Sequence, residues 1–193
     1  MSYSDGKIAG TLAFVAAAQF LLCLHIAESL YPSYSVSANY ISDLGVGDVA
    51  LLFNSSTFVL GILTLAAAYF INKAFSSKLL FILLVLTGIG AAGVGLLPEN
   101  FGAVHAVVSL IAFLFGGLSA IFSCRLLKSP MSYFSVLLGL LSLISLAFFV
   151  SGNYLGLGHG GMERMIAHPI LMWAIGFGGY LMSHGNETPT DKS

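Results

Sequence analysis

Residues 31–48 read YPSYSVSANYISDLGVGD and form the longest polar interruption between two strongly apolar stretches of the chain. They include Asp43 and Asp48 but no lysine or arginine. The apolar stretches on either side, 7–30 and 49–70, are long enough as helices to cross a hydrocarbon core of about 30 Å. We therefore predict that residues 31–48 form an ordered loop at one surface of a membrane protein.

The composition favours the same class of protein. The chain is 58% hydrophobic and 8% charged, with a mean hydropathy of +0.95, whereas soluble domains carry roughly 25% charged residues. The apolar runs are continuous and do not alternate with polar residues as the strands of a membrane barrel do, so helices are predicted. The sequence has no basic cluster, and the predicted partner is therefore the lipid bilayer and not nucleic acid.

The remaining apolar runs extend the pattern to about six membrane-spanning helices of roughly 20 residues each. Their predicted ranges are 7–30, 49–70, 79–97, 102–127, 132–152 and 162–182. The predicted fold class is an all-α integral membrane protein, a six-transmembrane-helix bundle over 1–185 followed by a polar cytoplasmic tail over 186–193. His168 precedes Pro169, and this pair disfavours regular helix, so the last helix is predicted either to kink there or to begin its first full turn there.

Lysine and arginine set the predicted orientation. If the helices alternate in direction, Arg164 stands alone on one side and the other basic residues share the opposite side: Lys7, Lys73, Lys78, Arg125, Lys128 and Lys192. Cytoplasmic loops carry an excess of Lys and Arg. We therefore predict a multi-pass protein of the cell membrane with both termini cytoplasmic and loop 31–48 on the outer face.

In this topology the ionisable residues gather in the outer third of the helices. Charged groups in the hydrocarbon cost about 2.5–3.5 kcal/mol on insertion scales and usually face the bundle interior, which predicts a polar pocket open to the outer face and roofed by loop 31–48. Its candidate residues are His25, Glu28, Asn39, Asp43, Asn54, His105, Ser109, Glu163, Arg164 and His168. Within this set, His105 and Ser109 share a helix face at i, i+4, and Asp43 is the predicted partner of Arg164.

Two interpretations of the pocket need no cofactor. In the first, the polar residues are a structural network in which Arg164 pairs with Asp43, Glu28 or Glu163, as in a structural or accessory subunit of a membrane complex. In the second, which is the leading functional hypothesis, the pocket binds a lipid-like or small anionic ligand with Arg164 as the partner of the anion. Oligomeric state and reaction are left open by the sequence.

Two further interpretations use the histidines. A metal-dependent hydrolase of lipid or amide could bind zinc through His25, His105 and His168, since three imidazoles and a water form an open catalytic site. Alternatively, His25 with His105 or His168 could be the axial ligands of a haem. The sequence demands no cofactor, because neither arrangement has a distinctive spacing.

Several segments of the chain resemble a known family. They are YPSYSVSANYISDLGVG (31–47), LFNSS (52–56), LLPEN (96–100), HAVVS (105–109) and GMERMIAHPILMW (161–173). On these segments the chain resembles the domain-of-unknown-function 998 (DUF998) family of archaeal and bacterial integral membrane proteins, with NYISDLG as the most specific motif. The resemblance implies six transmembrane helices but no established activity. It also implies a shared role, structural or functional, for Asn39, Asp43, Asn54, His105, Glu163 and Arg164.

Overall fold

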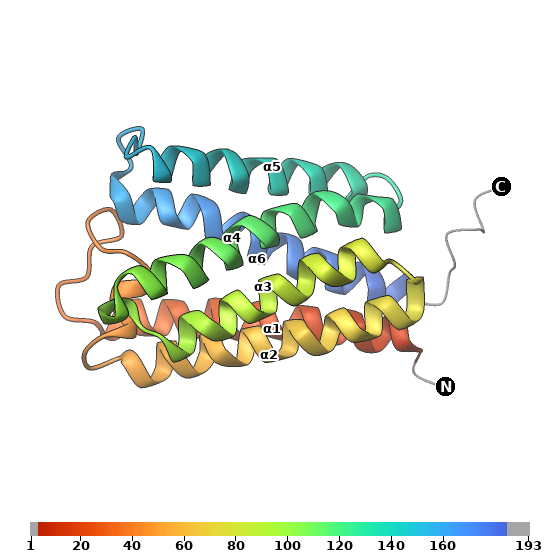
Figure 1. The fold of residues 1–193 in the computed structure, drawn as a ribbon, viewed down its shortest axis with the longest axis horizontal. Coiled ribbons are helices and arrows are strands. Elements are labelled where there is room, and N and C mark those ends of the chain that lie inside the picture. The colour runs from red at the N-terminus through yellow and green to blue at the C-terminus, as the bar shows by residue number, and fades with distance from the viewer. Residues whose placement is uncertain (1–3, 185–193) are drawn as a thin grey trace.

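Six long helices make up most of the described part of the protein, residues 4–184 of a computed structural model (Figure 1). They are α1 (Asp5–Leu30), α2 (Ala50–Phe75), α3 (Lys78–Leu96), α4 (Ala103–Ser123), α5 (Met131–Val150) and α6 (Gly158–His184). Short 3-10 helices lie between them: η1 (Ser42–Gly45), η2 (Glu99–Phe101) and η3 (Cys124–Leu126). All six long helices are long and apolar enough to cross a membrane. The predicted all-α, six-helix fold is confirmed, while the predicted tail 186–193 and Lys192 lie outside the described residues.

The helices run in alternating directions, and each packs on its neighbour in the chain (Figure 1). α6 also packs against α1, which closes the bundle, and α5 packs against both α4 and α6. Residues 31–49, η2 and residues 151–157 connect helices at one end, which we call the loop end. We call the opposite end the basic end, because it carries Lys7, Lys73, Lys78, Arg125 and Lys128.

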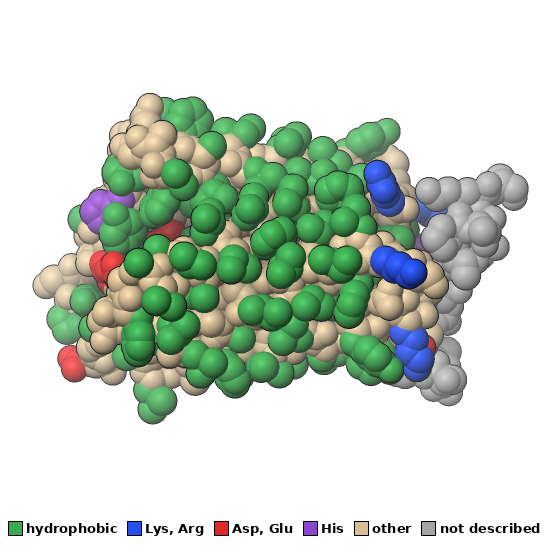
Figure 2. Space-filling view, viewed as in Figure 1, with side chains coloured by type: hydrophobic (Ala, Val, Ile, Leu, Met, Phe, Trp, Pro, Cys, Tyr) green, Lys and Arg blue, Asp and Glu red, His purple; other side chains and the backbone are tan. Residues whose placement is uncertain are grey.

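Charge is divided between the two ends (Figure 2). Lysine and arginine gather at the basic end, acidic side chains and histidine are visible at the loop end, and a belt of hydrophobic side chains lies between them. Lys73 Nζ at the end of α2 lies 3.1 Å from Asp5 Oδ1 at the start of α1, which ties these two helices together. The basic residues are thus grouped as predicted, and their assignment to the cytoplasmic side stays a prediction.

Two helices, α2 and α6, extend four or five residues beyond one end of their predicted ranges. α2 continues to Phe75 and ends where Ser76 adopts a left-handed conformation with φ of 52°. α6 begins at Gly158 and continues through Pro169, so neither a break nor a new start occurs at the proline. Proline is tolerated in membrane helices where neighbouring elements stabilise the freed backbone groups.

Glycine allows close backbone approach at two places that shape the site. A Cβ at Gly160 would overlap the carbonyl oxygen of Asn39, so the loop lies directly on the first turn of α6. A Cβ at Gly10 would lie 2.6 Å from the carbonyl oxygen of Gly178, so the backbones of α1 and α6 are in contact. Small residues permit this kind of helix contact in lipid, and here they bring α6 close to both the loop and α1.

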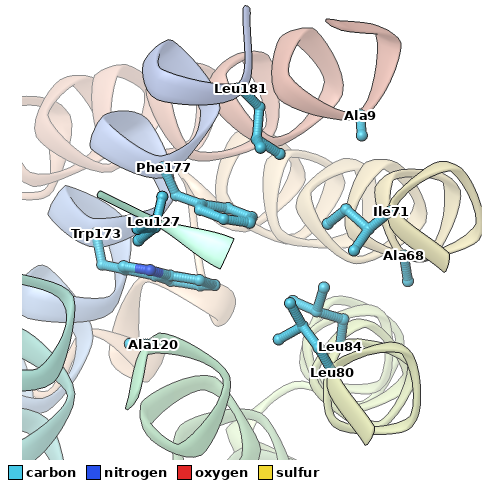
Figure 3. Close-up of a cluster of buried hydrophobic side chains, with 10 residues drawn as sticks. All are labelled: Ala9, Ala68, Ile71, Leu80, Leu84, Ala120, Leu127, Trp173, Phe177 and Leu181. Atoms are coloured by element: carbon cyan, nitrogen blue, oxygen red, sulfur yellow. The ribbon is translucent and has the colours of Figure 1, made fainter. Parts of the chain in front are cut away.

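A hydrophobic cluster closes the interior of the bundle at the basic end (Figure 3). Trp173 and Phe177 of α6 stack with their ring centroids 5.2 Å apart, and they face side chains of α2 and α3. Trp173 Nε1 donates to Ser123 Oγ at 2.9 Å, so the polar atom of the indole is satisfied. We call this cluster the basic-end plug, and its buried members are Ala9, Ala68, Ile71, Leu80, Leu84, Ala120, Leu127, Trp173, Phe177 and Leu181.

Candidate functional site

Arg164 of α6 holds the loop between α1 and α2 onto the bundle. Its Nη2 donates to Glu28 Oε1 and to the Tyr34 hydroxyl oxygen, each at 2.6 Å, and its Nε donates to Glu28 Oε1 at 3.2 Å. Its Nη1 donates to three backbone carbonyls, those of Val36 (3.1 Å), Asn39 (3.3 Å) and Gly160 (2.8 Å). We call Arg164, Glu28 and Tyr34 the clamp. Every nitrogen of the guanidinium group is engaged by the protein itself.

Tyr34 extends the clamp into the loop. Its hydroxyl accepts a hydrogen bond from Arg164 and donates one to the carbonyl of Tyr40 at 2.8 Å. Burial raises the pKa of Tyr34 to about 12, so the phenol keeps the proton that it donates at neutral pH. The clamp therefore fixes the loop on both sides of Asn39.

Asp43 does not pair with Arg164, so that prediction is wrong. The Oδ2 atom of Asp43 accepts hydrogen bonds from Asn39 Nδ2 at 2.8 Å and from the backbone N–H of Tyr40 at 3.0 Å. Burial, together with the neighbouring Asp43 carboxylate, raises the pKa of Glu99 to about 7. The physical reason for the difference is that Asp43 lies in η1, which packs on η2, whereas Arg164 is turned towards the end of α1.

A cavity of about 120 Å³ lies inside the bundle beneath the loop. Side chains of α1, α2, α3, α4 and α6 line it, and none of the described residues of α5 does. Along α6 the lining runs from Glu163 to Phe177, a separation of 14 residues that corresponds to ~21 Å of α-helix. Ile71, Leu84 and Trp173 belong to both the lining and the basic-end plug, so the plug is the floor of the cavity.

The walls of the cavity are apolar even where the sequence places threonine. The hydroxyls of Thr57, Thr64 and Thr87 donate to backbone carbonyls one turn earlier on their own helices, at 2.7, 2.7 and 2.8 Å. These hydroxyls are therefore satisfied without a ligand. The polar groups of the lining that remain are concentrated at the loop end, and they are Ser42, His105, Ser109 and Glu163.

Glu163 is the one charged residue of the lining, and its side chain is buried. The residue is 6% exposed, and its Oε2 accepts the backbone N–H of Ile41 at 2.5 Å. None of the described residues donates a hydrogen bond to Oε1. Oε1 is not sealed off by protein atoms, and Glu163 lines the cavity, so this oxygen is an acceptor that a ligand in the cavity can reach.

His105 is oriented by the end of α3. Its Nδ1 lies 2.7 Å from the carbonyl oxygen of Leu97, and because a carbonyl only accepts, Nδ1 carries a proton. Its Nε2 lies 3.2 Å from Ser109 Oγ, so in the neutral imidazole the Ser109 hydroxyl donates to Nε2. The predicted shared face of His105 and Ser109 is observed, and it is turned towards the cavity.

Comparison with known families gives one match. A family model described as "Protein of unknown function (DUF998)" matches residues 14–180 of the chain. The chain belongs to the DUF998 family. No curated protein and no solved structure matches the chain significantly. The clamp, Glu163 and His105 all lie inside the range that the DUF998 model covers, so the resemblance on the quoted segments is confirmed.

The histidines predicted as zinc ligands are not brought together in this DUF998 protein. His25 is exposed, its Nδ1 lies 3.1 Å from Glu28 Oε2, and its ring centroid is 6.3 Å from that of His168. Of these three histidines, only His105 lines the cavity. Between residues 4 and 184, no three His, Cys, Asp or Glu side chains are grouped as a metal ion requires. The zinc hypothesis therefore lacks its ligand set, and the cavity offers one of these histidines and not the pair that the haem hypothesis needs.

Asn54 and two residues that the sequence did not single out complete the loop end of this DUF998 protein. Asn54 Nδ2 donates to the carbonyl of Gly45 at 2.9 Å and fastens the end of η1 to α2. Tyr34 and Glu99 were not predicted as members, although both are polar residues at the loop end of the topology. The alanines of the cavity wall had no signal at all, because alanine is equally common where helices touch; they are Ala13, Ala16, Ala17, Ala67, Ala91, Ala112, Ala167 and Ala174.

Proposed function

We propose that the protein binds a lipid-like molecule whose apolar chain occupies the central cavity and whose polar end lies beside Glu163. The observation that carries this proposal is an apolar cavity, ~21 Å long, that meets a buried carboxyl group at its loop end. Ionisable residues within membrane helices commonly mark substrate or ligand sites. Glu163 fits that rule because it lines the cavity and has one oxygen to which none of residues 4–184 donates a hydrogen bond.

The size and the walls of the cavity support an apolar occupant over water. A volume of about 120 Å³ exceeds the ~15 Å³ that one water needs, so the nature of the walls decides what occupies the cavity. Water also needs polar partners, and cavities of comparable size with aliphatic walls stay dry and take up apolar guests. In a bilayer the apolar molecules that surround the protein are lipids, so a lipid hydrocarbon chain is the expected occupant.

The structure offers no free Arg164 side chain to bind a small anionic ligand. It depended on Arg164 as the partner of the anion, and all three guanidinium nitrogens of Arg164 are taken by Glu28, Tyr34 and backbone carbonyls. No Lys or Arg is among the residues that line the cavity. We therefore keep the lipid-like ligand and leave the small anion out of the proposal.

A pair of variants on one helix tests the proposal. Ala112 lines the cavity from α4, whereas Ala106 of the same helix is exposed on the outside of the bundle. We expect wild-type protein, purified in mild detergent, to retain a bound lipid that native mass spectrometry detects. Ala112→Phe fills the cavity and should lower the bound fraction at least tenfold, while Ala106→Phe should leave it unchanged.

Folding is checked by size-exclusion elution of both variants. If Ala112→Phe does not fold, Ala167→Phe fills the same cavity from α6. Wild-type protein that carries no lipid and binds none when reconstituted would overturn the proposal, and so would equal occupancy in the cavity variant and its control.

A further inference from the structure

We propose that the polar end of the bound lipid is a hydrogen-bond donor, either a hydroxyl or an amine, and that Glu163 accepts from it. This inference rests on the proposed function, since it names the chemical class of head group that the same cavity takes. A lipid headed by a carboxylate or a phosphate is the class that it excludes.

One of the two carboxyl oxygens of Glu163, Oε1, is available to a ligand. Ile41 occupies Oε2 through its backbone N–H, and no described residue donates to Oε1. Since Glu163 lines the cavity and is 6% exposed, and Oε1 is not sealed off by protein atoms, this oxygen is open to the space that a ligand would occupy. A hydroxyl or an amine at the end of the cavity supplies the missing donor, and bonds of this kind to a charged group contribute about 1.5–3 kcal/mol.

The other polar side chains at the loop end of the cavity already have partners or close polar neighbours within the protein. The Nδ1–H of His105 is used by Leu97, and its Nε2 faces Ser109. The hydroxyl of Ser42 lies close to the carboxyl group of Glu99, whose pKa it lowers. The neutral imidazole has no N–H left for a ligand, so no strong donor set awaits an anionic head group.

The charges around the loop end of the cavity disfavour an anionic head group. The lining contains Glu163 but neither Lys nor Arg, and Asp43 and Glu99 lie together next to Ser42. Like charges at short range are unfavourable, and the effect is larger inside a protein than in water. An anionic head group would therefore meet carboxyl groups, and Arg164, the cation whose charge reaches Glu163, is already paired with Glu28; a neutral or cationic donor meets an acceptor.

Three probes share one hydrocarbon chain and differ only in the head group, so their affinities compare the head groups directly. They are hexadecan-1-ol, hexadecylamine and hexadecanoic acid. Each displaces tritiated hexadecan-1-ol from delipidated wild-type protein in neutral detergent at about pH 8, where free carboxylic acids are ionised and amines are protonated. We expect the alcohol and the amine to bind at least tenfold more tightly than the acid.

The variant Glu163→Gln tests the named residue without removing its structural bond. The carboxamide oxygen still accepts the N–H of Ile41, and the carboxylate is gone from the end of the cavity. The preference for the amine over the acid should then fall from at least tenfold to within about threefold, a change of about 0.7 kcal/mol or more by the relation between affinity and free energy. Asp48→Asn removes an exposed carboxylate of the same loop and should leave the preference as in the wild type.

The outcomes distinguish this inference from the proposed function. If all three probes bind the wild type equally, or if the acid binds best, the head-group inference is overturned and chain binding stands. If none of the probes binds and no lipid co-purifies, both are overturned. A preference that survives unchanged in Glu163→Gln shows that another group selects the head and removes Glu163 from the proposal.

Discussion

At the scale of single residues, the sequence predicted which residues meet at the loop end better than it predicted how they pair. Arg164 is the only basic residue of that end, and Glu28, Asp43 and Glu163 were all plausible partners in the topology. The choice of Glu28 depends on the path of the loop, whose Tyr34 hydroxyl and backbone carbonyls complete the shell around the guanidinium. Such a path is a tertiary property, and no local pattern in the sequence encodes it.

The clamp makes a prediction at this scale. Arg164→Leu leaves Glu28 largely buried without its cation and should lower the free energy of unfolding by about 3–5 kcal/mol, measured by denaturant titration in mixed micelles. In double-mutant cycles Arg164 should couple to Glu28 by about 1–3 kcal/mol. Coupling to Asp43 should be weaker, and a stronger coupling to Asp43 than to Glu28 would contradict the clamp.

The carboxyl pair of Asp43 and Glu99 makes a prediction about pH. The pKa of Glu99 is about 7 in the folded protein and 4.5 as an ordinary value, so the folded state holds this proton more tightly than the unfolded state. The contribution of Glu99 to the free energy of unfolding is therefore full at low pH and declines as pH rises from about 4.5 to about 7. Glu99→Gln should reduce the change in melting temperature between about pH 5 and about pH 8; identical changes in wild type and variant would show that Glu99 does not titrate in this way.

At the scale of elements, hydropathy predicted the helices to within a few residues, because a long apolar segment in a bilayer must satisfy its backbone as helix. It did not show which face of each helix turns inward, since lipid and protein interior are both apolar. In α5 the buried residues include Ser135, Gly139 and Ser142, whereas Leu137 and Ile144 are exposed. Small residues mark the packed face of a membrane helix. The cavity wall depends on how the inward faces of five helices combine, and hydropathy does not give this combination.

Two glycines of one interface region allow a matched test of helix packing. A Cβ at Gly10 lies 2.6 Å from the carbonyl oxygen of Gly178, while a Cβ at Gly179 meets nothing within 4 Å. Gly10→Ala should force α1 and α6 apart and destabilise the protein by about 1–3 kcal/mol. Gly179→Ala should be neutral or slightly stabilising, since alanine is the better helix former. Thermal unfolding of the two variants side by side checks the difference, and equal melting temperatures would contradict the close approach.

At the scale of the whole molecule, the two ends differ in charge in the way that orients membrane proteins (Figure 2). The lysine pattern was readable from the sequence because it depends only on which connecting segments carry Lys and Arg. The cavity was not, because it exists only where side chains of helices far apart in the chain leave a shared space. The sequence therefore predicted the frame of the site and its polar end, but not the volume beneath it.

Orientation has a direct test. In a variant without Cys23 and Cys124, a cysteine introduced at Val36 of the loop end should react with a membrane-impermeant maleimide added to intact cells. A cysteine at Ser76 of the basic end should react only after permeabilisation. The reverse pattern would place the basic end outside and contradict the predicted cytoplasmic termini.

The basic-end plug determines whether the cavity passes through the bundle or is closed at one end. The stacked rings of Trp173 and Phe177 form the floor of the cavity, so the cavity is a dead end and not a conduit from one leaflet's surface to the other. Under the proposed function, a bound lipid would enter and leave at the end away from this floor. The clamp holds the loop at that end, and it would then influence how fast the lipid exchanges.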